Sequence, residues 1–252
     1  MPDDKQINAT QVESAEIEAA QAGFGDYFAD QSTTSAGNWL KHRARQRQLA
    51  AIQRFVPDTT SAILEIGPGL GELTALFVAA GYSDYTVVEP NTAMREYIAT
   101  MGVQTRDYFI PKMPEDDESF DVIVLFNVFE HLNGTPEAQI FMSEARRILR
   151  PDGLLCIMAP DYLHWQRDFF NGDYTHSHIT TVRRSIQLFH DNGFSVEQYT
   201  YFSGFASGLS ATFLSYLARC GLFLSVGNNL DSKLYKLKTT LLRSFLLIGI
   251  KA

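Results

Sequence analysis

Short apolar runs alternate with segments of helical character along most of the chain. The runs predicted to form buried strands cover residues 61–66, 85–88, 103–106, 120–126, 154–159, 195–201 and 245–250. The segments predicted to form helices cover residues 38–55, 72–80, 92–100, 136–149 and 181–191. This alternation predicts an α/β fold in which a doubly wound, mostly parallel, seven-stranded sheet carries helices on both faces.

Composition and charge divide the chain into four parts. Residues 1–36 are acidic and polar and are predicted to be flexible, and residues 37–203 form the predicted core domain with a helix at its start. Residues 204–243 are predicted to be a helical insertion over the acceptor site, followed by the final strand of the core at 244–252. Residues 204–252 contain six lysines and arginines against one acid, a net charge of +5, so the first 203 residues carry −13.

The composition also excludes some classes of function. The net charge of −8 argues against a nucleic-acid partner, because binding to phosphates needs a basic face. The two cysteines, Cys156 and Cys220, are not in a metal-binding spacing, and the beginning of the chain lacks the apolar core of a secretory signal. We therefore expect reduced thiols and a cytoplasmic protein.

A glycine-rich loop follows the first predicted strand and opens directly into a helix. In the run EIGPGLG at 65–71, the glycines allow a sharp turn and the close approach of a ligand, and the helix N-terminus adds free N–H groups. The third glycine, Gly71, comes one residue too early for the dinucleotide fingerprint G-x-G-x-x-G. The next strand ends at Glu89, whose carboxylate suits both hydroxyls of a ribose, a feature that nicotinamide enzymes share.

Several sequence blocks, taken in order, resemble those of the class I S-adenosylmethionine-dependent methyltransferases. They are EIGPGLGELT at 65–74, the strand that ends at Glu89, SFDVIV with NVFEH at 119–131, and LRPDGLL at 149–155. The blocks cover roughly residues 60–160 of the chain. The resemblance implies a Rossmann-like domain whose last strand is antiparallel, with S-adenosylmethionine as the cofactor and methyl transfer as the reaction.

The resemblance also implies which residues hold the cofactor. Glu65 and the loop glycines would meet its methionine part, and Glu89 would hold its ribose. The residues after the third strand would face the adenine, although this stretch matches the family loosely, and Asn127 would line the amino acid end. The full set is Glu65, Gly67, Gly69, Gly71, Glu89, Asp107, Tyr108 and Asn127.

Titratable side chains follow the fourth and fifth predicted strands, at the sheet edge where ligands bind in such folds. Glu130 and His131 follow the fourth strand, and His176 and His178, in the run DYTHSH at 173–178, follow the fifth. In one interpretation a histidine removes the proton of a hydroxyl acceptor, since its ordinary pKa lies near neutrality. In a second, Glu130, His131 and one of His176 or His178 bind a divalent metal that acidifies the hydroxyl. In a third, they have only a structural role.

The metal interpretation has a parallel within the family. Some O-methyltransferases of the ubiquinone pathway and of small RNAs use a Glu-x-x-Glu-His run with later ligands. Residues 127–131 are similar to that run, but Asn127 stands where the first glutamate would be. This departure weakens the metal interpretation, and we rank the histidine base above it.

The sequence indicates only the chemical class of the molecule that accepts the methyl group. Residues 173–198 resemble a block found in bacterial methyltransferases that act on glycans and specialised metabolites. Trp165, Phe169, Phe170 and Tyr174 precede or begin this block and suit a sugar ring or a planar acceptor, and they equally suit the packing of a lid. We expect O-methylation of a small hydroxylated metabolite or sugar unit, with N-methylation or a cofactor-binding partner protein of little activity as alternatives.

The predicted insertion differs from the rest of the chain in its charge and composition. Residues 204–226 contain a single charge, Arg219, and would just span a bilayer by length, but their serines and glycines favour a buried or amphipathic helix. The basic stretch 233–243 follows. We therefore hold two further expectations for residues 204–243, which are contact with an anionic membrane surface and contact with a second copy of the chain.

Overall fold

A computed structural model describes residues 35–221 and 233–252 of the chain. Almost all of the segment predicted to be flexible, 1–36, lies outside the described residues, as does part of the predicted insertion. Within the described ranges, no helix combines the length and the apolar character needed to cross a bilayer.

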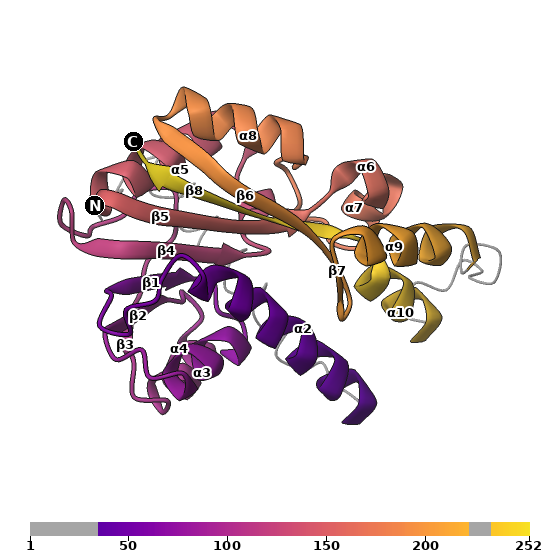
Figure 1. The fold of residues 1–252 in the computed structure, drawn as a ribbon, viewed down its shortest axis with the longest axis horizontal. Helices are drawn as coiled ribbons and strands as arrows, with labels where there is room; N and C mark the ends of the chain where they lie inside the picture. Colours follow the sequence, from indigo (N-terminus) through magenta and orange to yellow (C-terminus); the bar gives the residue numbers. More distant parts are fainter. Residues whose placement is uncertain (1–34, 222–232) are drawn as a thin grey trace, which may run out of the picture.

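The centre of the molecule is one twisted sheet of eight strands in the order β3-β2-β1-β4-β5-β8-β6-β7 (Figure 1). Strands β1 to β5 pair in parallel, and β8 runs antiparallel between β5 and β6. The strands are β1 (Ile63–Ile66), β2 (Tyr85–Val88), β3 (Gln104–Arg106), β4 (Phe120–Phe126), β5 (Leu149–Pro160), β6 (Phe194–Ser203), β7 (Ala206–Ser207) and β8 (Ser244–Lys251). The predicted doubly wound α/β fold and its antiparallel last strand are confirmed.

The predicted number of seven strands is wrong. The additional strand, β7, has two residues and forms an antiparallel hairpin with β6 at the sheet edge. So short a strand has no periodicity to detect, and its turn contains Gly204, whose φ is 50°. The first residues of the predicted helical insertion therefore extend the sheet.

Helices cover the sheet on both faces (Figure 1). Alternate strand residues point to opposite faces, so Ile63 and Val124 pack in the cluster under α2 to α4, while Leu64 and Ile123 pack in the cluster under α5 and α8. The helical elements are α2 (Ser35–Gln53), α3 (Glu72–Ala79), α4 (Thr92–Ala99), the 3₁₀ turn η1 (Phe129–His131), α5 (Gly134–Ile148), α6 (Tyr162–Trp165), α7 (Arg167–Asn171), α8 (Val182–Asp191), α9 (Leu209–Gly221) and α10 (Lys233–Leu241).

The insertion is tied to α6 and α7, which follow β5. Nζ of Lys238 in α10 lies 2.6 Å from Oδ2 of Asp168 in α7, and both side chains are buried. Arg243, just before β8, donates to Oδ2 of Asp161, the N-cap of α6, at 2.6 and 2.8 Å. Two residues of the basic stretch 233–243 are thus neutralised by buried carboxylates.

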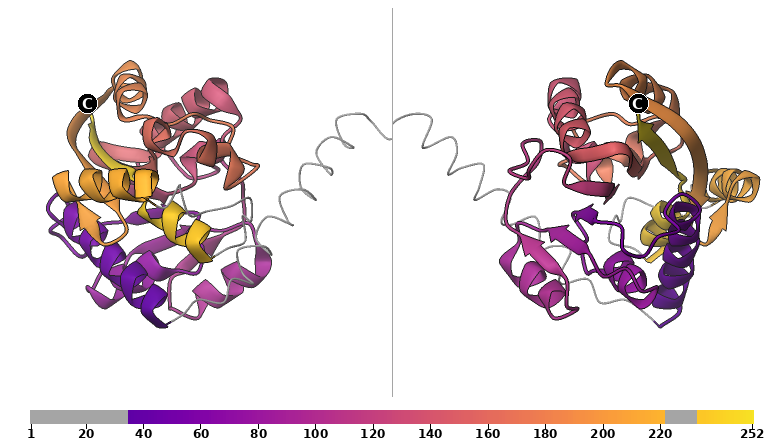
Figure 2. Two further views of the ribbon diagram at one scale, coloured as in Figure 1. Left: turned by 90° about the vertical axis from the view of Figure 1, so that its right-hand side faces the viewer. Right: turned by 60° about the vertical axis from the view of Figure 1, so that its left-hand side comes forward.

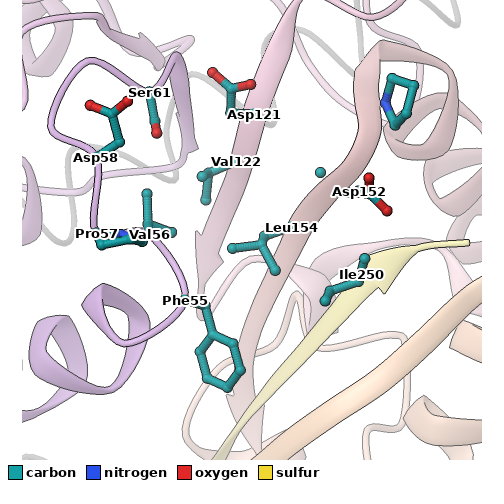
Figure 3. A pocket seen from close by; sticks show the side chains of 12 residues that line it. Phe55, Val56, Pro57, Asp58, Ser61, Asp121, Val122, Asp152, Leu154 and Ile250 are labelled. Atoms are coloured by element: carbon teal, nitrogen blue, oxygen red, sulfur yellow. The ribbon is translucent and has the colours of Figure 1, made fainter.

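A shallow cavity of about 210 Å³ lies at the opposite sheet edge from the carboxyl ends of the parallel strands (Figure 3). Its walls include Asp121 and Val122 at the start of β4, and Leu154 of β5, which pairs with Val122. Ligands in doubly wound sheets bind at the carboxyl ends of the parallel strands, so a functional site is expected there and not at this cavity.

Candidate active site

The glycine loop between β1 and α3 has the geometry that the sequence predicts. Gly67, Gly69 and Gly71 have φ values of 65°, 58° and 70°, a region that other residues rarely adopt. The amide of Gly67 donates to the carbonyl of Val88 at 2.9 Å, and Gly71 is the N-cap of α3. A Cβ added at Gly69 would meet no atom within 4 Å, so the loop leaves open space on its outer side for a ligand.

The same loop lies directly against the segment after β4. A Cβ added at Gly67 would lie 2.5 Å from Cγ2 of Val128, which stands between Asn127 and Phe129. Asn127 follows β4 with a φ of 56°, a left-handed conformation that asparagine tolerates better than most residues. Its backbone amide donates to the carbonyl of Met158 at 2.8 Å. The predicted cofactor loop and the predicted catalytic segment are therefore neighbours.

Glu65 points into the protein rather than into the loop's open space. Its buried Oε2 accepts hydrogen bonds from Thr74 at 2.5 Å and from Tyr85 at 2.8 Å. Burial raises the pKa of Glu65, while these two hydroxyls and the nearby Arg45 act in the opposite direction. The carboxylate thus fastens α3 to β1 and β2, and its predicted contact with the methionine part stays a prediction.

Two of the predicted cofactor residues, Glu89 and Asp107, lie just after β2 and β3. Glu89 is buried, and its Oε1 accepts from the amide of Asn91 at 2.8 Å. Burial raises the pKa of Glu89, against the effects of that amide and of Arg95. Arg95 donates to the carbonyl of Glu89 at 2.8 Å and pairs with the exposed carboxylate of Asp107 at 2.9 Å. Sequence reasoning missed this arginine, which fixes the relative position of the predicted ribose and adenine contacts.

Tyr108 has different partners from Asp107. Its hydroxyl lies 3.3 Å from Oε1 of Glu115, and its ring packs against the main core cluster. Burial raises the pKa of Tyr108, with a further contribution from Glu115. The side chain is half-buried, and its predicted contact with adenine stays a prediction.

Arg45 in α2 is a second residue that sequence reasoning missed. Its guanidinium lies 5.4 Å from the centre of the Phe126 ring at the end of β4, and its Nε lies 3.6 Å from Glu72 at the start of α3. The sequence showed only that the bases of this helix are spread around it. The structure places this one cation between the glycine loop and the end of β4.

Glu130 is the most unusual group at this sheet edge. Its side chain is buried, and Oε2 has no hydrogen-bond partner among the described residues. Burial raises the pKa of Glu130 to about 8, with a further contribution from Asp173, so the side chain is mainly protonated at neutral pH. Its backbone carbonyl accepts from the amides of Ser177 and His178 at 2.9 Å each, which ties the loop after α7 to η1.

His131 and His176 pack edge to face beside Glu130. Their ring centres are 4.8 Å apart, and burial lowers the pKa of His131 to about 4 and also lowers the pKa of His176. Nδ1 of His131 lies 2.7 Å from the hydroxyl of Thr175, which in turn donates to Asp173 at 2.6 Å. Both imidazoles are neutral at physiological pH, as a proton acceptor must be.

The tautomer of His176 is fixed by the backbone. Its Nδ1 lies 2.6 Å from the carbonyl of Phe169, and since a carbonyl only accepts, Nδ1 carries the proton. The lone pair of the neutral ring is therefore on Nε2, which lies 4.0 Å from Oε1 of Glu130. This arrangement presents a basic nitrogen at the carboxyl ends of β4 and β5.

His178 does not join this pair. Its buried ring packs edge-on against Phe129 at 5.0 Å between centres, and its Nδ1 has no hydrogen-bond partner among the described residues. Burial lowers the pKa of His178 to about 4, helped by Arg184. The group of side chains whose ligand atoms lie within 4.8 Å of one another is Glu130, His131 and His176.

That group could hold a divalent ion only after contraction. Nitrogen and oxygen ligands bind zinc at about 2.0–2.2 Å, so two ligands on opposite sides are about 4.4 Å apart at most. Asn127, at the position of the missing glutamate, is exposed. These three side chains therefore fit a metal site less well than they fit a site with a proton acceptor.

Of the four aromatic residues that the sequence offers as acceptor contacts, two pack against other parts of the protein and two are exposed. Phe169 is buried against Tyr162 and His176, and the indole of Trp165 donates to the carbonyl of Arg243 at 3.1 Å. Phe170 and Tyr174 are exposed. The first two therefore have a packing role, and the other two are open to an acceptor.

Comparison with known proteins shows the family of this chain. A family model described as a methyltransferase domain matches residues 40–199, which is well over half of the chain. A methyltransferase-like protein of Schizosaccharomyces pombe, described as uncharacterized, is 31% identical over 103 residues. That match covers 40% of this chain and 39% of the yeast protein, so the chain matches about two fifths of its relative's length.

Solved structures share the fold at low sequence identity. A chain from the complex between the Haloferax volcanii Trm112 methyltransferase activator and a methyltransferase has a TM-score of 0.64 at 14% identity, over 90% of this chain and 97% of that one. A Methanosarcina mazei S-adenosylmethionine-dependent methyltransferase has a TM-score of 0.57 at 15% identity, over 80% and 96%. The family match and the fold together place this chain among the class I S-adenosylmethionine-dependent methyltransferases.

Proposed function

We propose that the protein methylates a hydroxyl oxygen of a small metabolite or sugar unit, and that His176 accepts the hydroxyl proton. The observation that carries the proposal is the hydrogen bond from Nδ1 of His176 to the carbonyl of Phe169, which leaves Nε2 as the basic atom. An amine acceptor needs only a neutral nitrogen, whereas a hydroxyl gains from a base of this kind. Proton transfer to such a base typically contributes about 10² to 10⁴ in rate.

S-adenosylmethionine, when bound, supplies an activated methyl group on a sulfonium. The open side of the glycine loop at Gly69 and the carboxylate of Glu89 are the features of this chain that fit it. We assign the loop backbone to the methionine part, Glu89 to the ribose and Asn127 to the amino acid end. Much of the remaining work of the protein is to hold the acceptor beside His176 in the correct orientation.

The glycine loop gives a prediction about cofactor binding. Replacing Gly69 with alanine is expected to weaken S-adenosylmethionine binding about tenfold or more, because the new methyl group enters the open space. The left-handed conformation adds a stability loss of about 1–2 kcal/mol. Titration calorimetry and urea unfolding measure the two effects separately.

Gly67 provides the contrast for that experiment. An alanine there places its Cβ 2.5 Å from Val128, which adds an overpacking loss of about 1–3 kcal/mol to the backbone cost. Undiminished cofactor affinity in Gly69→Ala would contradict the assignment of this loop. A Gly67→Ala protein no less stable than Gly69→Ala would contradict the packing argument.

The proposed reaction is tested with a panel of acceptors. Purified protein is incubated with S-adenosylmethionine labelled in its methyl group and with phenols, sugars and amines of similar size. We expect label in the hydroxylated compounds together with S-adenosylhomocysteine as the second product. Label in amines alone would overturn the choice of oxygen, and cofactor binding without turnover on any acceptor would favour a binding protein.

The last outcome has a structural parallel. The cyclase SpnF has the same fold, with a TM-score of 0.59 at 14% identity over 81% of this chain and 80% of its own. This fold therefore also serves a protein named for another reaction, and the site must carry the functional argument. The neutral His131–His176 pair beside Glu130 supports catalysis over simple binding.

A further inference from the structure

Helix α9 buries small side chains and exposes large apolar ones, which is the reverse of an ordinary surface helix. The side chains it buries are small: Ala211 and Ser215 are 0% exposed, and Ala218 is 3% exposed. The large apolar side chains point outward, with Leu209 91% and Phe213 67% exposed. A helix that only covered a core would bury its large residues, because the gain grows with the apolar area removed from water.

The outward residues form one continuous stripe. Leu209, Phe213, Tyr216 and Leu217 are spaced by four, three and one residues, which places them on one side of the helix. We call these four residues the α9 stripe. Figure 2 (left) shows α9 and α10 facing the viewer at the outer surface of the molecule. Stripes of this kind are typical of surfaces that contact a partner.

The charge around the stripe limits what that partner can be. Neither α9 nor α10 contains an acidic residue, and Arg219 lies in the last turn of α9. Lys238 and Arg243 are neutralised by Asp168 and Asp161, and the sequences of the two helices also contain Arg219, Lys233 and Lys236. A second copy docked by the same face would bring like charges together with no acid in either helix to pair with them.

An anionic lipid surface meets both requirements. Apolar and aromatic side chains insert at the boundary between its headgroups and acyl chains, and the anionic headgroups attract nearby lysine and arginine. The first 203 residues carry −13, so repulsion turns the body of the protein away from such a surface while the basic end faces it. We propose that the α9 stripe inserts into the interface of a membrane that contains anionic lipids and anchors the protein there peripherally.

The test uses the full chain and vesicles of defined composition. Protein is mixed with sedimentable vesicles of phosphatidylcholine alone, or of phosphatidylcholine with about one third phosphatidylglycerol, and the bound fraction is measured at low and high salt. We expect binding to the anionic vesicles, weaker binding at high salt, and little binding to neutral vesicles. No binding of the wild-type protein to anionic vesicles would overturn the proposal.

A double variant tests the stripe itself. Phe213→Ser with Leu217→Ser is expected to lower the partition onto anionic vesicles about tenfold or more, with an unchanged melting temperature because both residues are exposed. Ile140→Ser, an exposed apolar residue on α5, is the matched control and should bind as the wild type does. Equal binding of the double variant would also overturn the proposal.

Light scattering in solution, which measures the oligomeric state, tests the alternative that the α9 stripe contacts a second copy of the chain. A dimer that the double variant dissociates, together with absent vesicle binding, would assign the stripe to a second copy and reject the membrane. Vesicle binding is measured without cofactor or acceptor. Failure here therefore leaves the proposed methyl transfer untouched, and failure of that reaction leaves this proposal untouched.

Discussion

Replacing His176 with alanine is expected to lower the rate of methyl transfer to a hydroxyl acceptor by about 10² to 10⁴, with cofactor affinity nearly unchanged. The imidazole is held by the carbonyl of Phe169 and touches no element of the glycine loop in the described contacts. The rate follows from single-turnover measurements, and the affinity follows from calorimetry. His190→Ala, an exposed histidine on α8, is the matched control and should retain full activity.

The pH dependence of the same reaction has a definite sign. Burial lowers the pKa of His176 below the ordinary value of 6.5, so the ring is already neutral at pH 7. Only the neutral ring accepts a proton, so activity should rise with pH through that lowered pKa and then become level near neutrality. The alanine variant should lack this rise. Full activity of His176→Ala would remove the proposed base.

Metal ions must be tested in the same experiment. If a chelator abolished wild-type activity and magnesium restored it, Glu130, His131 and His176 would be acting through a metal and the base assignment would fail. We expect activity to persist in the chelator, because the three donor atoms lie up to 4.8 Å apart and Asn127 stands where the metal-binding run has a glutamate.

The strands could be predicted closely where an apolar run has polar neighbours on both sides. Residues 85–88 and 120–126 have the predicted bounds as β2 and β4. The strand predicted at 154–159 begins earlier, at Leu149, because residues 150–153 form an irregular step within β5 between the pairs Phe120–Leu149 and Val122–Leu154. Helices α6 and α7 were missed because four or five residues are too short for a periodic pattern.

The site could be predicted as far as the sheet topology determines it. Glu130, His131 and His176 meet because β4 and β5 are parallel neighbours, so their carboxyl ends share one edge. His178 was grouped with them because it is only two residues from His176, but the loop turns its ring onto Phe129. Nothing in the sequence separates these two histidines.

The missed residues depend on contacts between distant parts of the chain. Lys238 and Asp168 are 70 residues apart, and Arg243 and Asp161 are 82 apart. Each looked like an ordinary solvated charge in the sequence. Pairing of this kind depends on how the insertion docks, which no local pattern encodes.

The buried pair between α7 and α10 carries the largest expected effect on stability. Asp168→Ala leaves the ammonium group of Lys238 buried without its carboxylate, which lies 2.6 Å away in the wild type. Breaking a buried pair from one side typically costs about 3–5 kcal/mol. Urea unfolding should show a loss of this size, or a smaller one if α10 detaches before the rest of the domain unfolds. Asp117→Ala, which removes an exposed carboxylate 2.7 Å from Arg147, should cost about 1 kcal/mol or less.

A second variant separates charge from packing. Asp168→Leu combined with Lys238→Met removes both charges together, and it should recover most of the lost stability because no buried ion is left unpaired. Phe169, next to Asp168 in α7, supplies the carbonyl that holds His176, so Asp168→Ala should also lower methyl transfer and the double variant should restore part of it. Hydrogen exchange at residues 168–172 and 235–241 locates the change. An Asp168→Ala protein with wild-type stability and exchange would show that this pair does not fasten the insertion to the core.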